Sequence, residues 1–166
     1  MFFKKTTKKK PDFSLDDLAQ IPFLNDLPDN QLEILAEVMN KKYFASNDYV
    51  FREGDAFSSV YFLIKGSVKI LKKVPDLAEQ KMLAELRAPQ LLGEQALISH
   101  GKRSAAAYAM EPLMVAELTY QDFEMLIEKH PRLAVNIIKK IANIISVRLK
   151  TLNAKYVKEG NQMNSL

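Results

Sequence analysis

The stretch Tyr49–Lys73, YVFREGDAFSSVYFLIKGSVKILKK, decides the fold class of this 166-residue chain. It is rich in β-branched and aromatic residues, which favour strands. Val60, Phe62 and Ile64 fall on one face of an extended strand, with the intervening residues on the other face. The Glu-Gly-Asp segment and Gly66 are turn signals. The stretch therefore predicts short strands joined by tight turns.

Further strands are predicted after this stretch. The segments KMLAEL (81–86), SAAAYAM (104–110) and LMVAEL (113–118) have the composition of strands, and VPDLAEQ (74–80) that of a hairpin loop. The strand pattern begins at Tyr43 and ends at Leu118. Several short strands at this spacing are typical of an antiparallel sandwich or barrel.

Helical periodicity is found on both sides of the strands. Residues 15–21 predict a short helical turn, and Asp29 is the expected N-cap of an amphipathic helix. Thr119 is expected to cap a helix that ends before Pro131. Residues 132–157 contain neither proline nor glycine and carry an apolar stripe, which predicts a long helix. The expected order is helix, β-structure and two helices.

The net charge of +4 comes from the N-terminus. Five of the 24 basic residues lie within the first ten positions, which leaves 19 basic residues against 20 acidic ones. The body of the protein is therefore close to neutral, and its charge indicates no broad nucleic-acid-binding face. The five are Lys4, Lys5, Lys8, Lys9 and Lys10.

The composition also excludes several kinds of site. The chain has no cysteine, which rules out disulfides and thiolate zinc sites. Its two histidines, His100 and His130, are too far apart in sequence to predict a metal site. No apolar run approaches the ~20 residues of a membrane span, and no signal peptide is recognised, so a cytoplasmic location is expected. No nucleophile elbow or suitably spaced carboxylate pair is present, and we expect neither catalysis nor a cofactor.

The segment Gly93–Ala106, GEQALISHGKRSAA, concentrates the polar chemistry of the chain. A glycine that opens a short helical turn offers backbone N–H groups to a phosphate, and Arg103 adds a bidentate clamp. Glu94 accepts hydrogen bonds from sugar hydroxyls, as a carboxylate does in dinucleotide sites. Small residues are expected to line the approach to this site. The combination predicts a nucleotide, although a simple ion pair between Glu94 and Arg103 is the structural alternative.

The longer segment LLGEQALISHGKRSAA resembles the phosphate-binding cassette of cyclic nucleotide-binding domains. The segments VFREGDAFSSVYFLIKGSVKI and VAELTYQDFEMLIEKHP are similar to the early strands and the exit helix of the same family. The resemblance implies an α+β fold, mainly β: an antiparallel jelly-roll-like β-roll with an N-terminal helix and two C-terminal helices. The expected domain covers residues 15–157, with the β-roll at about 43–118 and the C-terminal helices at 119–157. A basic flexible tail at 1–14 and a frayed tail at 158–166 flank it.

The resemblance also implies roles for individual residues. Glu94 would bind the ribose 2′-hydroxyl, Arg103 the cyclic phosphate, and Ser104 would lie beside that phosphate. In the family the C-terminal helix closes over the base, and Arg148 is the residue proposed here to stack on it. The remaining cassette residues are Leu92, Gly93, Gln95, Ala96 and Ala105.

The function that this resemblance implies is a regulatory module that senses a cyclic nucleotide. cAMP is expected ahead of cGMP, because in the family a small residue or serine at the position of Ser104 accompanies cAMP, while threonine often accompanies cGMP. The C-terminal helix would signal to a protein partner or to a homodimer. No DNA-binding module is expected, because too few residues follow the long helix for a recognition helix and its partner.

Two alternatives to the sensor remain open at the sequence level. The family usually has a glycine-aspartate turn and an aromatic residue where this chain has Ala88–Leu92, and this departure raises the hypothesis of a structural adaptor with a degenerate, ligand-free pocket. The lysine tail, with Phe2 and Phe3, raises the hypothesis of contact with a membrane surface. A solvated terminus is the simpler interpretation of that tail.

Overall fold

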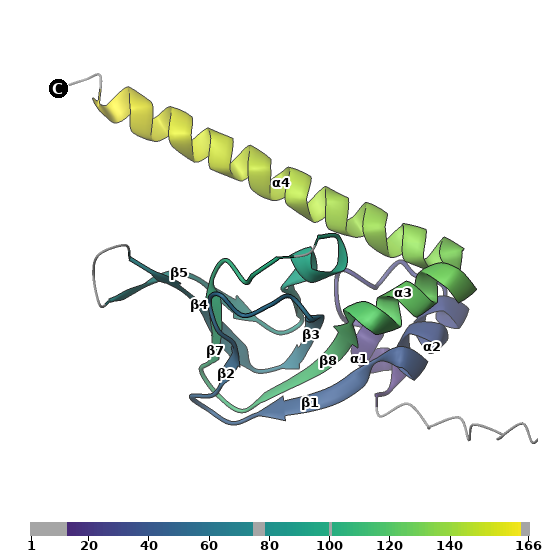
Figure 1. Ribbon diagram of the computed structural model, residues 1–166. Helices are drawn as coiled ribbons and strands as arrows, with labels where there is room; N and C mark the ends of the chain where they lie inside the picture. The colour runs from purple at the N-terminus through teal and green to yellow at the C-terminus, as the bar shows by residue number, and fades with distance from the viewer. Residues whose placement is uncertain (1–12, 75–78, 100, 164–166) are drawn as a thin grey trace, which may run out of the picture. The chain divides into compact units, whose positions relative to one another are not determined.

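The computed structural model describes residues 13–74, 79–99 and 101–163, with backbone alone for residues 155–163. The chain divides into two compact units, Met1–Met125 and Leu126–Leu166. The first unit contains the strands and the candidate site, and the second contains the long C-terminal helix (Figure 1). The lysine tail lies outside the described residues, and so does the hypothesis of membrane contact that rests on it.

Among the residues that the structure describes, two short helices precede the strands. Helix α1, Leu15–Ala19, begins with a capping box in which Asp17 N donates to Ser14 Oγ (3.1 Å) and Ser14 N donates to the Asp17 carboxylate (3.4 Å). Helix α2, Asp29–Val38, has Pro28 at its N-cap, so the expectation of an Asp29 cap was wrong. Asp29 is instead the first helical residue, where its negative charge faces the positive end of the helix dipole.

In the described part of the chain, eight strands form two four-stranded antiparallel sheets, which confirms the predicted fold class. One sheet has the order β1-β8-β3-β6 and the other β2-β7-β4-β5. The strands are β1 (Asn40–Phe44), β2 (Tyr49–Phe51), β3 (Ser59–Lys65), β4 (Ser67–Lys73), β5 (Gln80–Arg87), β6 (Gln90–Leu92), β7 (Ala106–Ala109) and β8 (Leu113–Thr119), with a 3₁₀ turn η1 (Glu94–Leu97) after β6.

The sequence did not predict two of these strands in full. β1 begins at Asn40, three residues before the expected start at Tyr43, because a lysine-rich edge strand lacks an apolar pattern. Its Lys42 Nζ lies 2.8 Å from the Glu117 carboxylate on neighbouring β8. β6 has only three residues, too few to show any periodicity. Its three residues pair with β3, and Leu91 lies opposite Phe62.

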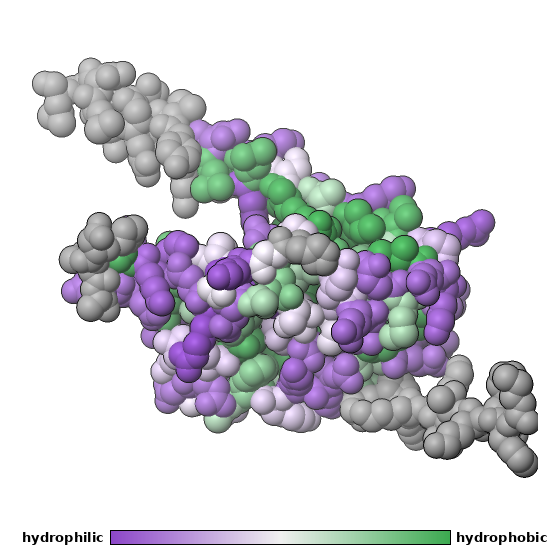
Figure 2. All heavy atoms as spheres, in the orientation of Figure 1, coloured by the Kyte–Doolittle hydropathy of each residue, from purple (hydrophilic) through white to green (hydrophobic). Residues whose placement is uncertain are grey.

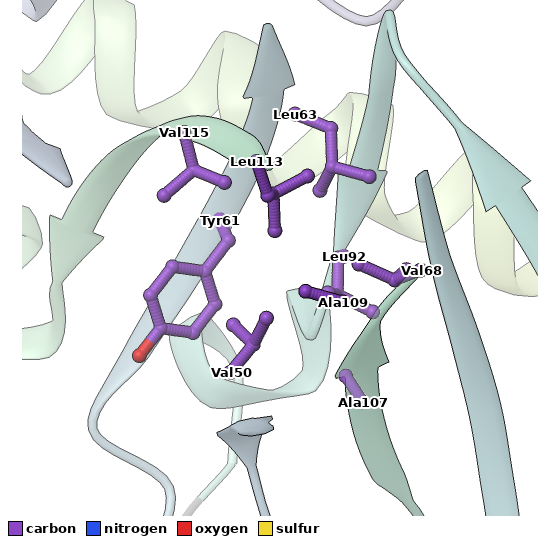
Figure 3. Packing of buried hydrophobic residues seen from close by; sticks show 9 residues of the cluster. All are labelled: Val50, Tyr61, Leu63, Val68, Leu92, Ala107, Ala109, Leu113 and Val115. Carbon is purple, nitrogen blue, oxygen red and sulfur yellow. The ribbon is translucent and has the colours of Figure 1, made fainter. Parts of the chain in front are cut away.

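The core of the β-roll is formed by side chains from both sheets that point toward one another (Figure 3). Leu63 and Val115 come from the first sheet, and Val68 and Ala107 come from the second. All four are completely buried. The full cluster is Val50, Tyr61, Leu63, Val68, Leu92, Ala107, Ala109, Leu113 and Val115.

Strand β3 is buried on both faces, and this explains its almost continuous apolar sequence. Tyr61 and Leu63 belong to the cluster between the sheets, so Val60 and Phe62 lie on the opposite face. Phe62 is completely buried there and packs against Phe23, with 5.8 Å between ring centroids. The alternation predicted from the sequence is confirmed, and each of its faces has a separate hydrophobic partner.

Two helices follow the strands, as predicted: α3 (Tyr120–Lys129) and α4 (Pro131–Met163). Thr119 caps α3, because Asp122 N donates to its Oγ1 (3.1 Å) and its hydroxyl donates to the Asp122 carboxylate (2.5 Å). Helix α4 continues to Met163, past residue 158, where the frayed tail was expected to begin.

Exposed apolar side chains occur along the described part of α4, where Figure 2 shows hydrophobic residues at the surface. Val147, Leu149 and Leu152 are each more than half exposed. Among the described residues, no helix combines the length and the hydrophobicity needed to cross a membrane.

Candidate functional site

The candidate site begins where β6 ends. Gly93 has φ +77°, a left-handed conformation that glycine adopts without steric cost, and it turns the chain from β6 into η1. Ala96 N donates to the Gly93 carbonyl (3.1 Å) and closes the first turn of η1. Glu94 is the first residue of η1 and is 3% exposed.

Arg103, near the other end of the segment Gly93–Ala106, contacts this turn with its side chain. Its side chain is 4% exposed, although arginine is rarely so buried without partners. Nη1 donates to the Gly93 carbonyl (3.2 Å), and Nη2 donates to the Ser59 carbonyl (2.5 Å). Nε is buried and has no hydrogen-bond partner within the described part of the chain. The guanidinium thus satisfies two of its three nitrogens with backbone carbonyls.

Aromatic rings surround the guanidinium. Its central carbon lies 4.1 Å from the ring centroid of Phe51, 5.5 Å from that of Phe57 and 5.8 Å from that of Tyr61. The small residues expected to line the approach are thus accompanied by three aromatic rings around the guanidinium, which the sequence did not indicate. They supply cation–π attraction, which partly offsets the loss of hydration on burial.

Burial dominates the electrostatics of Arg103. Removal of the cation from water lowers the pKa of Arg103, and the nearby acidic groups, among them Asp55 and Glu94, act in the opposite direction. Glu94 therefore acts on Arg103 as a neighbouring charge, while the hydrogen bonds that the guanidinium donates go to backbone carbonyls.

The other residues of the predicted cassette lie around these two. Leu92 is buried in the core cluster and Ala96 is 1% exposed, so both support the turn from inside. Gln95 and Ser104 are exposed, and Ala105 is half-buried. The structure therefore brings the predicted cassette residues together in one region of the first unit.

The backbone before Arg103 is paired with the turn between β2 and β3. Phe57 N donates to the Gly101 carbonyl (2.9 Å), Arg103 N donates to the Asp55 carbonyl (2.7 Å), and Gly54 N donates to the Arg103 carbonyl (2.9 Å). This short antiparallel ladder fixes the main chain of the arginine. The Gly-Asp turn in the sequence signals a bend, and nothing in its composition signals that Arg103 pairs with it.

The structure also shows where the Ala88–Leu92 departure and the proposed base cap, Arg148, lie. The departure at Ala88–Leu92 does not prevent formation of β6, since Ala88 N donates to the Gly66 carbonyl (2.9 Å) and Leu91 is buried. Arg148 lies on α4 with an exposed side chain, and its role as base cap stays a prediction. Within the described ranges, no group of three acidic, histidine or cysteine side chains is placed to hold a metal ion.

The sequence profile of the cyclic nucleotide-binding domain matches residues 41–130. The chain belongs to this family. The match includes the whole β-roll except the first residue of β1, and it contains both Glu94 and Arg103.

Two curated relatives are much longer than this chain. The chain is 32% identical over 100 residues to cGMP-dependent protein kinase, isozyme 1, of Drosophila melanogaster, covering 60% of this chain and 13% of the kinase. It is 30% identical over 139 residues to glutaminase 1 of Bradyrhizobium diazoefficiens, covering 84% of this chain and 22% of the glutaminase. The chain therefore spans less than a quarter of either relative.

Solved structures support the same fold. The N-terminal domain of a transcriptional regulator from Streptomyces coelicolor is 28% identical, with a TM-score of 0.70 over 84% of this chain and 96% of that domain. A cyclic nucleotide-binding domain from Methylobacillus flagellatus is 19% identical, with a TM-score of 0.75 over 87% of this chain and 81% of that one. The second likeness concerns the fold alone.

Proposed function

We propose that this domain is a cytoplasmic sensor that binds a cyclic nucleotide, cAMP in preference to cGMP, and that α4 passes its occupancy to a partner protein or a second copy. The observation that carries this proposal is Arg103, a buried cation whose Nε has no hydrogen-bond partner among the described residues. A buried, unsatisfied N–H group destabilises a folded protein.

A phosphate oxygen would satisfy this group. The guanidinium is pre-positioned by the carbonyls of Gly93 and Ser59, and its Nε is the nitrogen that has no acceptor among the described residues. An anion would also restore part of the electrostatic stabilisation that burial removes from Arg103. The cyclic phosphate of a nucleotide supplies both the acceptor and the charge.

Glu94 supports the nucleotide over a simple anion. A carboxylate close to the arginine repels a free phosphate ion, whereas it accepts a hydrogen bond from the ribose 2′-hydroxyl. The backbone of Gly93, Gln95 and Ala96 would line the cyclic phosphate and its ribose, with Ala105 on the facing segment. Leu92 supports this backbone from the core.

The proposed output is a change in the position of α4. A ligand shifts such an equilibrium only by its differential affinity for the two positions. Arg148 on α4 would stack on the base and so couple helix position to occupancy. The exposed Val147, Leu149 and Leu152 would contact the partner or the second copy.

Calorimetric titration tests the proposal. We expect saturable binding of cAMP by the full chain and weaker binding of cGMP. Arg103→Ala should weaken cAMP binding by about 100-fold, because it removes charge-assisted hydrogen bonds, and Arg103→Lys should restore only a small part of the affinity. Glu94→Gln keeps the size of the side chain and should bind cAMP more tightly than Glu94→Ala does. Absence of binding by the wild type to both nucleotides would overturn the proposal.

A structural adaptor is the second candidate, because the Arg103 fork already bonds two carbonyls and could serve only to hold the loop. Thermal melting separates the two functions. A ligand at 100 times its dissociation constant stabilises the native state by about 2.7 kcal/mol, which raises the melting temperature by several degrees. A melting temperature that millimolar cAMP leaves unchanged would favour the adaptor.

A further inference from the structure

Lys72, on β4, bridges two segments that are distant in sequence. Its Nζ donates to the carbonyl oxygen of Ser104 (2.6 Å) and to Oε1 of Glu53 (2.7 Å). The other carboxylate oxygen of Glu53 accepts from Lys73 N (2.8 Å). The Glu53 side chain is only 18% exposed, while that of Lys72 is 44% exposed. Glu53 and Lys72 therefore hold one another in a defined geometry next to the cassette.

The two ends of this bridge hold the same piece of backbone. Glu53 precedes Gly54, whose N–H donates to the Arg103 carbonyl, and Asp55 accepts from Arg103 N. Lys72 binds the next carbonyl along the chain, that of Ser104. The main chain of Arg103 is thus fixed on one side by the turn and, one residue later, by an ammonium group that the same turn orients.

We infer that Lys72 and Glu53 are positioning residues for the phosphate-binding arginine, an inference that rests on the proposed function of Arg103. Lys72 acts through the backbone: two of the three N–H donors of its ammonium group bind Glu53 and the Ser104 carbonyl. The Lys72 ammonium also lowers the pKa of Glu53, because its hydrogen bond favours the ionised carboxylate. A small displacement of Arg103 would move its buried Nε out of line with an incoming phosphate.

The first experiment measures the backbone directly. Hydrogen exchange of the ligand-free full chain is compared for the wild type, Lys72→Met and Lys81→Met. Lys81 lies opposite Lys72 in the β4–β5 pair, so its removal changes the charge equally without touching Ser104. We expect faster exchange of the Arg103 and Gly54 amides in Lys72→Met only. Equal protection in all three proteins would overturn the inference.

The second experiment measures affinity for cAMP. Lys72→Met and Glu53→Gln should each weaken binding by about five-fold, the scale of one lost charge-assisted hydrogen bond at a partly exposed site. The double variant should be no weaker than the weaker single one, because both changes break one unit. Lys72→Arg should recover most of the affinity. Additive losses, or an equal loss in Lys81→Met, would contradict a positioning role and indicate general charge effects.

The two experiments separate the inference from the proposed function. If wild-type protein binds neither cAMP nor cGMP, the proposed function fails, whatever the exchange data show. If the wild type binds cAMP and Lys72→Met binds it with unchanged affinity, the proposed function stands and the positioning inference fails.

Discussion

The Arg103 guanidinium occupies the space into which any side chain at Gly93 would project. A Cβ atom placed on Gly93 would collide with Arg103 Nη1, before it reached the Phe51 ring at 3.6 Å. The same Nη1 donates to the Gly93 carbonyl. Glycine at position 93 therefore has two functions: it adopts the left-handed turn into η1, and it leaves room for the arginine to bind the backbone.

Gly93→Ala should weaken cAMP binding more than it weakens the fold. The left-handed conformation costs a residue with a Cβ about 1–2 kcal/mol, and the added methyl group displaces the guanidinium. We expect at least a ten-fold loss of affinity, measured by calorimetry, with a fall of several degrees in melting temperature.

Gly54→Ala is the matched control. Gly54 has φ +89°, and a Cβ there would meet nothing within 4 Å. This variant has the same kind of backbone strain without the collision. Because the Gly54 N–H donates to the Arg103 carbonyl, hydrogen exchange of the Arg103 amide is compared in both variants. If Gly54→Ala leaves that exchange unchanged and still loses as much stability and affinity as Gly93→Ala, backbone strain alone explains the result and the steric role of Gly93 is wrong.

The sequence predicts the fold because each face of the strands has a consistent environment. The apolar runs of β3 and β8 and the turn at Gly66 follow from propensity and alternation. β1 could not be predicted in full, because its lysines reflect an exposed edge and its position depends on pairing with β8. β6 depends on pairing with β3, a tertiary contact that three residues cannot encode locally.

The polar residues of the candidate site could be predicted from the sequence, but the side chains that surround them could not. Glu94 and Arg103 are conspicuous in sequence because they lie among small residues. The rings of Phe51 and Phe57 lie about fifty residues earlier, and only the folding of β2 and its following turn brings them to Arg103. The Lys72 contact is equally hidden, since the lysine is one of several on β4 and only tertiary structure directs it to Ser104.

The packing on the outer face of β3 predicts a large effect of Phe62→Ala. Phe62 is completely buried against Phe23, and such a truncation costs about 3–5 kcal/mol through lost transfer free energy and a cavity. Urea unfolding measures the change. Tyr43→Ala removes a ring that is 69% exposed and should cost less than about 1 kcal/mol. A similar small loss for both variants would contradict the two-faced burial of β3.

Stability should depend on pH through Glu53. The hydrogen bond from Lys72 and that from the Lys73 N–H lower the pKa of Glu53 below its ordinary value of 4.5. The stabilisation is therefore complete above about pH 4.5, where an unfolded-state glutamate is ionised, and is lost as pH falls through the lower folded-state value. The melting temperature of the wild type should exceed that of Glu53→Gln at pH 7, and this difference should shrink on acidification below pH 4.5.

The Lys72→Met background provides the control for this titration. Lys72→Met removes the hydrogen bond that is the largest cause of the lowered pKa of Glu53. In this background the pH-dependent difference in melting temperature between glutamate and glutamine at position 53 should be smaller. A difference that is independent of pH would mean that the Glu53 charge does not stabilise the fold.

The proposed preference for cAMP is tested at Ser104, whose side chain is exposed while its carbonyl is held by Lys72. A threonine has a restricted χ1, so its hydroxyl is held more firmly than that of serine. Guanine presents an exocyclic amino group as a donor, and a fixed hydroxyl can accept from it. Ser104→Thr should therefore raise the affinity for cGMP relative to cAMP by about five-fold, the scale of one net hydrogen bond. Ser104→Ala removes the hydroxyl and should not raise it. Competition titrations with both nucleotides measure the ratio, and an unchanged ratio in Ser104→Thr would show that position 104 does not select the base.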